Sequence, residues 1–448
     1  MENKSKIGFK QYLILASLLF GLFFGAGNLI FPINLGQTAG PNWVPATIGF
    51  LLSSICLPLF SILALSITKS KSMYNLAEPA GKPFAIVFLV LTHASLGLLI
   101  AAPRTATVTF SMGVQPFLPK GVSGIALLIF SFIFFLVTLL LAFNEQSVTR
   151  NVGKVLNPLF IILMILLFFI AFCLYDDIRD LPLMPTSGKG MSSFTTGFLE
   201  GYNTMDALAG LSFGITIITA IEIFEKRTKQ KSLAIAKVGS LTMGFEALIY
   251  TFLIALGAGS LSFTKVAADG GQAFTAIMRH YTGIAGAAIL AALTLLACLT
   301  TAIGLLTSLS QDLSSRFKKI SYKQFLIIAT VISFGIANFG LTKIILYSAP
   351  ILSFLYPLAI SLILLGMLYR FIGKNTFIYK GTIGIVMIPA VLDLIHNLPP
   401  VLLSFKPFSA INRWGLSYIP LFEIGLDFIP FLLIGLIGSL IFNQFKNK

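Results

Sequence analysis

Long apolar runs recur along the whole chain, separated by short polar segments. Each run reaches the length of about 20 residues that an α-helix needs to cross hydrocarbon roughly 30 Å thick. The runs are continuous rather than alternating, which excludes a membrane β-barrel. The third run can be extended past Arg104 toward Phe110. The pattern predicts twelve membrane-spanning helices at 11–36, 43–67, 84–103, 123–143, 156–175, 194–223, 233–258, 283–309, 322–340, 345–369, 378–398 and 421–443.

Composition agrees with this pattern. The 448 residues are 56% hydrophobic and 10% charged, whereas soluble domains carry about 25% charged residues. The longest predicted loops, 176–193 and 399–420, are too short for a soluble domain. We therefore expect an all-α polytopic membrane protein with a single transmembrane domain over 1–448.

The formal net charge of +15 would suggest nucleic acid in a soluble protein. Here most lysines and arginines fall in those polar segments that share a side with residue 1. Positively charged loops stay in the cytoplasm, so both termini are predicted to be cytoplasmic. The basic excess therefore indicates topology and contact with the lipid bilayer, and not nucleic-acid binding.

Two of the predicted helices are interrupted near their middle. The first carries Gly25, Ala26, Gly27 and Asn28 at bilayer depth, and the sixth carries the sequence Gly-Tyr-Asn-Thr-Met-Asp at 201–206. The sixth helix comes five helices after the first, an odd number, so the two broken helices run in opposite directions. Broken helices at matching positions of two oppositely oriented halves are typical of inverted-repeat transporters with a midplane site. The division predicted here is helices 1–5 (11–175), helices 6–10 (194–369) and the added helices 11–12 (378–443).

The free ends of a broken helix suit the two charged groups of a zwitterion. The half that starts near Asn28 presents free N–H groups and a positive dipole end, which suit a carboxylate. The half that ends near Phe24 presents carbonyl oxygens, which suit an ammonium group or a hard metal cation. The alternative is a plain kink whose glycines allow close helix packing, because Gly and Pro are common in membrane helices.

At this point the sequence resembles a known family. The segments "FGAGNLIFP" at 24–32, "APRTATV" at 102–108 and "GFLEGYNTMDALAGLSFG" at 197–214 are similar to those of the bacterial branched-chain amino acid:cation symporters. This resemblance implies a LeuT-type fold, a bacterial cell membrane, and uptake of leucine, isoleucine or valine. It implies a coupling cation, with sodium favoured over a proton, and neither a cofactor nor an obligate protein partner.

The resemblance also implies site residues. The substrate would be bound at the two breaks, by Gly25, Ala26, Gly27, Asn28, Tyr202, Thr204 and Asp206. A sodium ion would be bound by Gly21 and Phe24 of the first helix and by Ala297, Thr300 and Thr301, which share one face of the eighth helix. The alternative for the threonines is a hydroxyl bonded to a carbonyl of its own helix.

Charged residues within the runs leave several roles open. Asp206 could cap the second half of its helix, face a substrate ammonium, or bind a coupling ion. Glu246 could relay protons, as could Asp206, or it could be a neutral acid buried between helices. Arg104 is expected at the outer end of the third helix, with its side chain extended to the interface or paired with an acidic loop residue. Glu200 is expected near solvent.

Other classes of function fit less well. No catalytic triad, HExxH sequence or Gly-rich phosphate loop is present in the sequence, which argues against an enzyme. A channel remains an alternative, but broken helices in two halves favour alternating access. A proton-coupled symporter of other small apolar amino acids is a second alternative.

Overall fold

The computed structural model describes residues 8–119, 121–143, 161–166, 168–169, 181, 190–213, 221 and 228–446. All regular structure in these ranges is helical. Eight helical stretches within them are long and apolar enough to cross a membrane, and two shorter apolar helices span Phe9–Phe23 and Tyr322–Ala337. Most of the predicted fifth helix, 156–175, and most of the loop 176–193 lie outside the described residues.

The first half of the chain follows the predicted runs closely. Its helices are α1 (Phe9–Phe23), α2 (Ala26–Ala39), α3 (Trp43–Leu51), α4 (Leu57–Thr68), α5 (Met73–Ala77), α6 (Lys82–Ala94), α7 (Ala101–Gly113) and α8 (Ser123–Ala142). Two π-helical turns, η2 (Leu52–Cys56) and η4 (Ser95–Leu99), lie within the second and third predicted helices. The third helix therefore continues well past Pro103, as its polar extension suggested.

The second half is also built from the predicted helices. They are α11 (Gly190–Tyr202), α13 (Thr228–Gly259), α14 (Gly270–Arg316), α15 (Tyr322–Ala337), α16 (Leu341–Met367), α17 (Tyr369–Ile372), α18 (Thr376–His396), α19 (Pro400–Leu403), α20 (Lys406–Tyr418) and α21 (Phe428–Lys446). Within α14, Gly283 has φ +60° and separates a short leading helix from the membrane-spanning part. The predicted start of the eighth helix at 283 is therefore confirmed.

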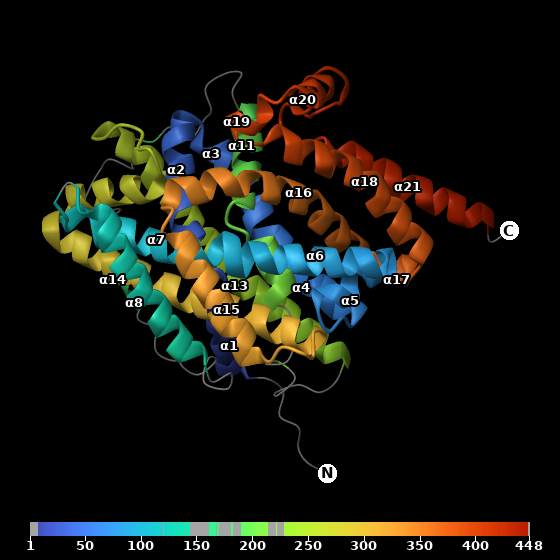
Figure 1. Cartoon of the computed structure of the whole chain (residues 1–448), viewed down its shortest axis with the longest axis horizontal. Coiled ribbons are helices and arrows are strands. Elements are labelled where there is room, and N and C mark those ends of the chain that lie inside the picture. Colours follow the sequence, from blue (N-terminus) through green and yellow to red (C-terminus); the bar gives the residue numbers. More distant parts are fainter. Residues whose placement is uncertain are drawn as a thin grey trace, which may run out of the picture.

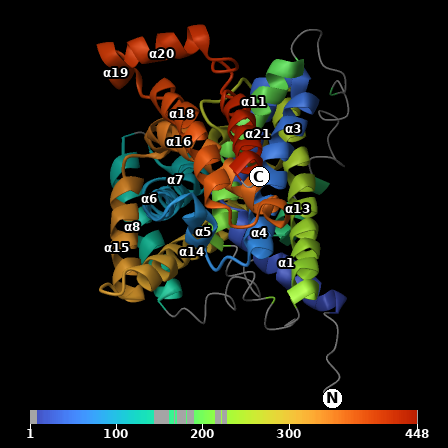
Figure 2. The same ribbon diagram turned by 90° about the vertical axis from the view of Figure 1, so that its right-hand side faces the viewer.

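Two predictions at the C-terminal end are wrong. The segment 399–420 was expected to be a loop, but α19 and α20 occupy most of it, at the end of the bundle opposite the start of α1 (Figures 1 and 2). The twelfth helix was expected from 421, but it begins at Phe428, because Leu421 and Gly425 have positive φ and form turns. An apolar run alone does not reveal such a turn.

The broken first helix is surrounded by other helices. The second half of the broken helix, α2, packs along α13 and α14 (Figure 1). Two other pairs of helices also pack closely: α11 along α3, and α7 along α14. Glycine makes these approaches close: a Cβ at Gly257 of α13 would lie 2.2 Å from the Ile33 carbonyl oxygen of α2, and one at Gly197 of α11 would lie 2.0 Å from that of Ala46. Small residues at helix contacts are typical of membrane bundles.

Candidate functional site

The first predicted break is a true interruption of the helix. Helix α1 ends at Phe23 and α2 starts at Ala26, with extended backbone at Phe24 and Gly25. The Gly25 N–H, at the N-cap of α2, donates to Oδ1 of Asn28, the third residue of the new helix, at 2.9 Å. All of these residues are buried. The start of α2 is thus enclosed in protein, and one of its N–H groups is bonded by a side chain.

The second break has a different local cause. Helix α11 ends at Tyr202, and Met205 adopts φ +68°, a conformation that non-glycine residues rarely hold. The Ala209 N–H donates to the Met205 carbonyl at 2.9 Å, so the next helix starts directly after Met205 and is described as far as 213. Asp206 therefore lies within the first turn and is not the helix cap.

The two breaks are joined by side-chain hydrogen bonds. Asn28 Nδ2 donates to Asp206 Oδ2 at 2.7 Å, and the Tyr250 hydroxyl of α13 donates to the same oxygen at 3.1 Å. Asn28 also donates to the Tyr250 hydroxyl. Only 2% of Asp206 is exposed. One buried carboxylate thus connects residues that stand 178 positions apart in the chain.

Arg104 lies at this site, so its predicted position at the membrane surface is wrong. It is only 3% exposed, and its Nη1 donates to the Asn203 carbonyl of the second break at 2.9 Å. Its guanidinium lies over the Phe31 ring, 5.0 Å from the centroid. A Cβ built on Gly27 would lie 2.7 Å from Arg104 Nη2. Arg104 therefore reaches both breaks.

The sequence carried a signal for this position of Arg104. Residues 105–110 continue the run and include three threonines. Such polar side chains favour a helix that continues among other helices over one that ends at the lipid surface. In the structure, Thr105 and Thr109 donate to carbonyls of their own helix, at 2.5 and 2.8 Å. Residues 101–110 are all buried. The third helix thus continues beyond Arg104 and places it at depth.

The predicted sodium ligands are brought together only in part. Thr301 Oγ1 of α14 donates to the Phe24 carbonyl oxygen at 3.2 Å. Thr300 Oγ1 donates to the Ala297 carbonyl of its own helix at 2.8 Å, as the alternative for these threonines stated. Gly21 is buried on α1, one turn before Phe24. The first break and the eighth helix therefore meet at Thr301 and Phe24.

Glu246 lies on α13 one helical turn before Tyr250 and is completely buried. Neither of its carboxylate oxygens has a hydrogen-bond partner among the described residues. It acts electrostatically on Asp206. Glu200, expected near solvent, is half-buried and accepts from Asn203 Nδ2 at 3.0 Å. The part of the site around Asp206 thus holds a second acidic side chain, whose carboxylate oxygens bond no described residue.

A small cavity of about 20 Å³ lies where the breaks meet. Its polar lining includes Asn28, Arg104, Thr204, Asp206 and Thr301. Its apolar lining includes Leu22, Leu96, Ala101, Ala209, Phe213 and Leu305. Such a volume holds about one water molecule, for which roughly 10–15 Å³ suffices.

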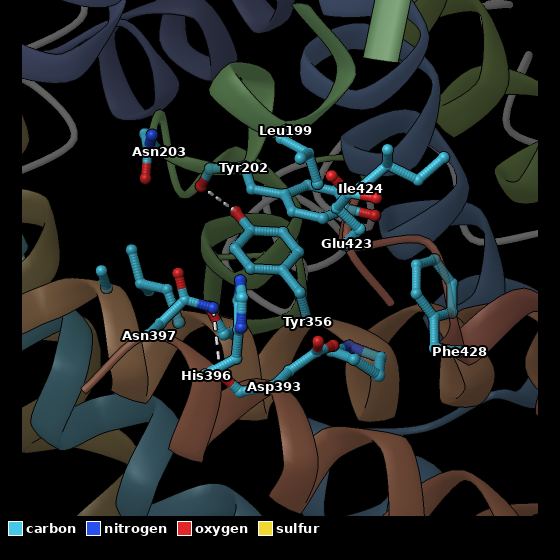
Figure 3. A pocket seen from close by; sticks show the side chains of 15 residues that line it. Leu199, Tyr202, Asn203, Tyr356, Asp393, His396, Asn397, Glu423, Ile424 and Phe428 are labelled. Atoms are coloured by element: carbon cyan, nitrogen blue, oxygen red, sulfur yellow. Dashed lines mark hydrogen bonds between the residues drawn. The ribbon is translucent and has the colours of Figure 1, made fainter. Parts of the chain in front are cut away.

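Tyr202 does not line this cavity. Its ring stacks on that of Tyr356 of α16 with centroids 4.1 Å apart, and its carbonyl accepts from the Tyr356 hydroxyl. Both tyrosines face a second cavity (Figure 3). The structure therefore brings together Gly25, Ala26, Gly27, Asn28, Thr204 and Asp206 of the predicted substrate residues and separates Tyr202 from them.

Comparison with known proteins identifies relatives along the whole chain. The model of the family described as branched-chain amino acid transport protein matches residues 9–446. The branched-chain amino acid permease BrnQ of Lactobacillus delbrueckii subsp. lactis is 37% identical over 430 residues, which is 95% of each chain. The permease BraB of Bacillus subtilis is 37% identical over 440 residues, or 98% of this chain and 96% of that one.

Two solved structures share the fold. MhsT, solved in complex with L-phenylalanine, superposes with a TM-score of 0.59 at 15% identity and covers 90% of this chain and 98% of its own. Mhp1, a nucleobase-cation-symport-1 family transporter, superposes with a TM-score of 0.54 at 13% identity and covers 98% and 94%. Both are LeuT-type transporters. The likeness confirms the predicted fold class, with its broken helices 1 and 6.

Proposed function

Because this chain belongs to the branched-chain amino acid transport protein family, we propose that it takes up leucine, isoleucine or valine by symport with a cation, sodium in preference to a proton. The chain is a multi-pass membrane transporter and not an enzyme. The observation that supports the proposal most is the enclosure of Arg104, Asp206 and Thr301 around one cavity between two broken helices. The proposed location is the bacterial cell membrane, with both termini in the cytoplasm and no cofactor.

The cavity offers both poles that a zwitterion needs. Arg104 supplies a fixed positive charge beside Gly27, and guanidinium groups bind carboxylates through paired hydrogen bonds. The backbone N–H groups that open α2 add to this pole. Asp206 supplies the negative pole for the ammonium group. Arg104 and Asp206 both line the cavity, so each end of a bound amino acid would meet a group of opposite charge.

The apolar lining supports selection for a branched aliphatic side chain. Leu22, Leu96, Ala209, Phe213 and Leu305 surround the cavity. An apolar pocket discriminates by only about 1–3 kcal/mol per methylene, so leucine, isoleucine and valine would share the site. Lysine and glutamate would each bury a charge without a partner, which costs several kcal/mol.

Thr301 and Phe24 support sodium as the coupling ion. The Thr301 hydroxyl and the Phe24 carbonyl each present an oxygen atom, the ligand type that hard cations prefer. We place the ion between them, with the Gly21 and Ala297 carbonyls and the Thr300 hydroxyl as further ligands. The Thr301 hydroxyl would turn from the Phe24 carbonyl toward the ion, and Thr300 would do so from Ala297. Coupling follows from this position, because the same break that lines the substrate cavity would hold the ion.

The cavity of about 20 Å³ is too small for leucine. Binding must therefore widen it, and the two broken helices with Arg104 are the groups that would have to separate. Alternating access by movement of one group of helices against the other provides this opening.

The test is uptake into liposomes that contain the purified full-length chain. A sodium gradient alone should drive leucine against its concentration gradient, and a proton gradient alone should not. Uptake driven only by the proton gradient would favour the alternative, for which Glu246 near Asp206 is the supporting observation. Leucine flux that never exceeds equilibrium would indicate a channel.

A further inference from the structure

A second cavity, of about 220 Å³, lies between α11, α16, α18 and the segment 423–428 before α21 (Figure 3). We call it the Asp393 cavity. It is separated from the central site by the second break: the Asn203 carbonyl accepts from Arg104, while Asn203 and Tyr202 line the Asp393 cavity. One short segment of backbone therefore has a cavity on each side.

The lining of the Asp393 cavity is partly apolar and partly acidic. Leu199, Leu352, Ile424 and Phe428 contribute apolar side chains, together with the stacked rings of Tyr202 and Tyr356. Asp393, Glu423 and His396 contribute ionisable groups. His396 Nδ1 contacts Asn412 Oδ1 of α20 at 2.8 Å. Among the residues that the structure describes, no lysine or arginine lines this cavity. Its lining is therefore suited to a ligand with an apolar body and a positive end.

Asp393 is the group that points to a ligand. It lies on α18, is 5% exposed, and its Oδ1 has no hydrogen-bond partner among the described residues. Asp427 lies next to it, is completely buried, and has no partner for either oxygen in the same part of the chain. The carboxyl groups of Asp393 and Asp427 interact directly. Two buried carboxyl groups in contact share one proton and hold a single negative charge between them. A cation placed here would neutralise that charge and would gain strongly.

We propose that the Asp393 cavity is a binding site for an organic ammonium group with an apolar side chain, held by Asp393 with Asp427 behind it. The class of ligand rests on the proposed function, because a branched-chain amino acid carries such an ammonium group. The apolar walls distinguish this ligand from a hydrated metal ion. A volume of about 220 Å³ exceeds the roughly 10–15 Å³ needed for one water more than tenfold, so a small molecule fits.

The position of the cavity gives the site a role in transport. A ligand on Asp393 would contact Tyr202, Asn203 and Tyr356, which form the wall toward the second break. The Tyr356 hydroxyl bonds the Tyr202 carbonyl, and Arg104 bonds the next carbonyl along the chain, that of Asn203. An occupied Asp393 cavity would therefore hold an organic ammonium ligand next to the central site, at a separate set of residues.

Isoamylamine is the probe that separates the two sites. It has the side chain and the ammonium group of leucine but no carboxylate, so Arg104 gives it no anchor in the central site. Its binding to the purified full-length chain in detergent is measured by calorimetry in buffer without sodium. We expect saturable binding to the wild type and to Arg104→Gln. We expect affinity to fall at least about tenfold in Asp393→Asn.

A second variant keeps the carboxylates and fills the space. Leu352→Trp adds bulk to the cavity wall and should also remove isoamylamine binding. For Asp393→Asn and Leu352→Trp, leucine binding at the central site and a single peak in size-exclusion chromatography establish that the protein is folded. For Arg104→Gln, the single peak is the control. If Asp393→Asn fails this control, Leu352→Trp decides the question alone.

Several outcomes would overturn the inference. These are no isoamylamine binding by the wild type, unchanged binding in the folded variants, or an Asp393-dependent response to sodium chloride that isoamylamine does not share. Failure of the proposed function gives a different result: Asp393-dependent amine binding would persist although leucine is not transported. Leucine uptake without any amine binding would overturn only the Asp393 cavity.

Discussion

Gly27 is the residue at which the central site leaves no room for a side chain. A Cβ there would lie 2.7 Å from Arg104 Nη2 and 3.3 Å from the Phe31 ring. Gly27→Leu should therefore displace Arg104 from the first break and fill the small cavity. We expect normal membrane insertion and at least about a hundredfold loss of leucine uptake, equivalent to roughly 2.7 kcal/mol or more. Uptake of labelled leucine, with the amount in the membrane measured in parallel, checks this.

The matched control is a glycine on the outer surface of a helix. Gly244 of α13 is exposed, and a Cβ there meets nothing within 4 Å. Gly244→Leu adds the same bulk and should leave uptake within about twofold. If Gly27→Leu transports leucine with the affinity of the wild type, the first break does not line the substrate site.

Arg104 is the residue whose charge the proposed function needs most. Arg104→Gln keeps a hydrogen-bond donor but removes the positive charge that would bind the substrate carboxylate. Hydrogen bonds to charged groups contribute about 1.5–3 kcal/mol, so the dissociation constant for leucine should rise roughly 10- to 150-fold. Arg104→Lys keeps the charge but not the forked geometry and should lie in between. Equal leucine affinity in all three proteins would remove Arg104 from the carboxylate site.

At this scale the sequence revealed the glycines directly, whereas the only signal for the position of Arg104 was the set of threonines that follow it. Gly25, Gly27 and Asn28 stand out because such residues are unfavourable in an uninterrupted membrane helix. Arg104 was misplaced because the depth of a residue depends on where its helix ends. The π-helical turn at 95–99 and the buried continuation through Phe110 set the depth of Arg104. This depth depends on packing, which the hydrophobic pattern of one segment does not encode.

Helix α14 contains the eighth membrane-spanning helix and contacts the first break through Thr301. If Thr301 binds sodium, replacing it with valine keeps the shape and deletes the ligand oxygen. Thr301→Val should raise the sodium concentration for half-maximal leucine uptake at least about tenfold, a loss of roughly 1.4 kcal/mol. Thr300→Val should add to this only if its hydroxyl leaves the Ala297 carbonyl when sodium binds. Sodium titrations of leucine uptake measure both effects.

The same helix supplies the control. Thr294 of α14 is buried, and its hydroxyl donates to the Leu290 carbonyl at 2.7 Å, within its own helix. Thr294→Val removes a hydroxyl of the same kind outside the proposed ion site and should change the sodium dependence little. An unaltered sodium curve in Thr301→Val would leave the ion without its proposed ligand.

At the scale of single helices, the hydrophobic pattern predicted the lengths of the apolar segments well. It predicted turns and amphipathic helices poorly. The division of the first helix into α1 and α2 follows from glycine chemistry, and the start of the eighth at Gly283 follows from the hydrophobic run. The helix α20 was missed because its mean composition is polar while only one of its faces is apolar. Trp414 on α20 was the available signal, since tryptophan is frequent at membrane interfaces.

For the whole molecule, the central site depends on contacts that no local pattern contains. Asn28 and Asp206 bond across 178 residues, and Tyr250 joins them from a third helix. The resemblance of three short motifs supplied the fold, and the fold then explains why these residues meet. The separation of Tyr202 from the central cavity depends instead on its stacking with Tyr356, which only the packed structure reveals.

The coupling ion is a property of the whole transport cycle, and substitution of Glu246 tests whether that ion is sodium or a proton. Glu246 is completely buried with no hydrogen-bond partner for its carboxylate among the described residues, and it lies one turn from Tyr250. A charged carboxylate in such a position is very costly, so a purely structural Glu246 would be protonated and neutral. Glutamine has nearly the shape of that neutral acid.

If sodium drives uptake and Glu246 only fills space, Glu246→Gln should transport leucine under a sodium gradient within about threefold of the wild type, which corresponds to roughly 0.7 kcal/mol. If Glu246 carries the coupled proton, the same variant should lose all uptake driven by a pH gradient, because an amide neither takes up nor releases a proton. Measuring wild type, Glu246→Gln and Thr301→Val in liposomes, each under a sodium gradient alone and a pH gradient alone, separates the two couplings. Sodium-driven uptake that survives in Glu246→Gln and weakens in Thr301→Val is the expected result, and the reverse pattern would assign the coupling to the proton.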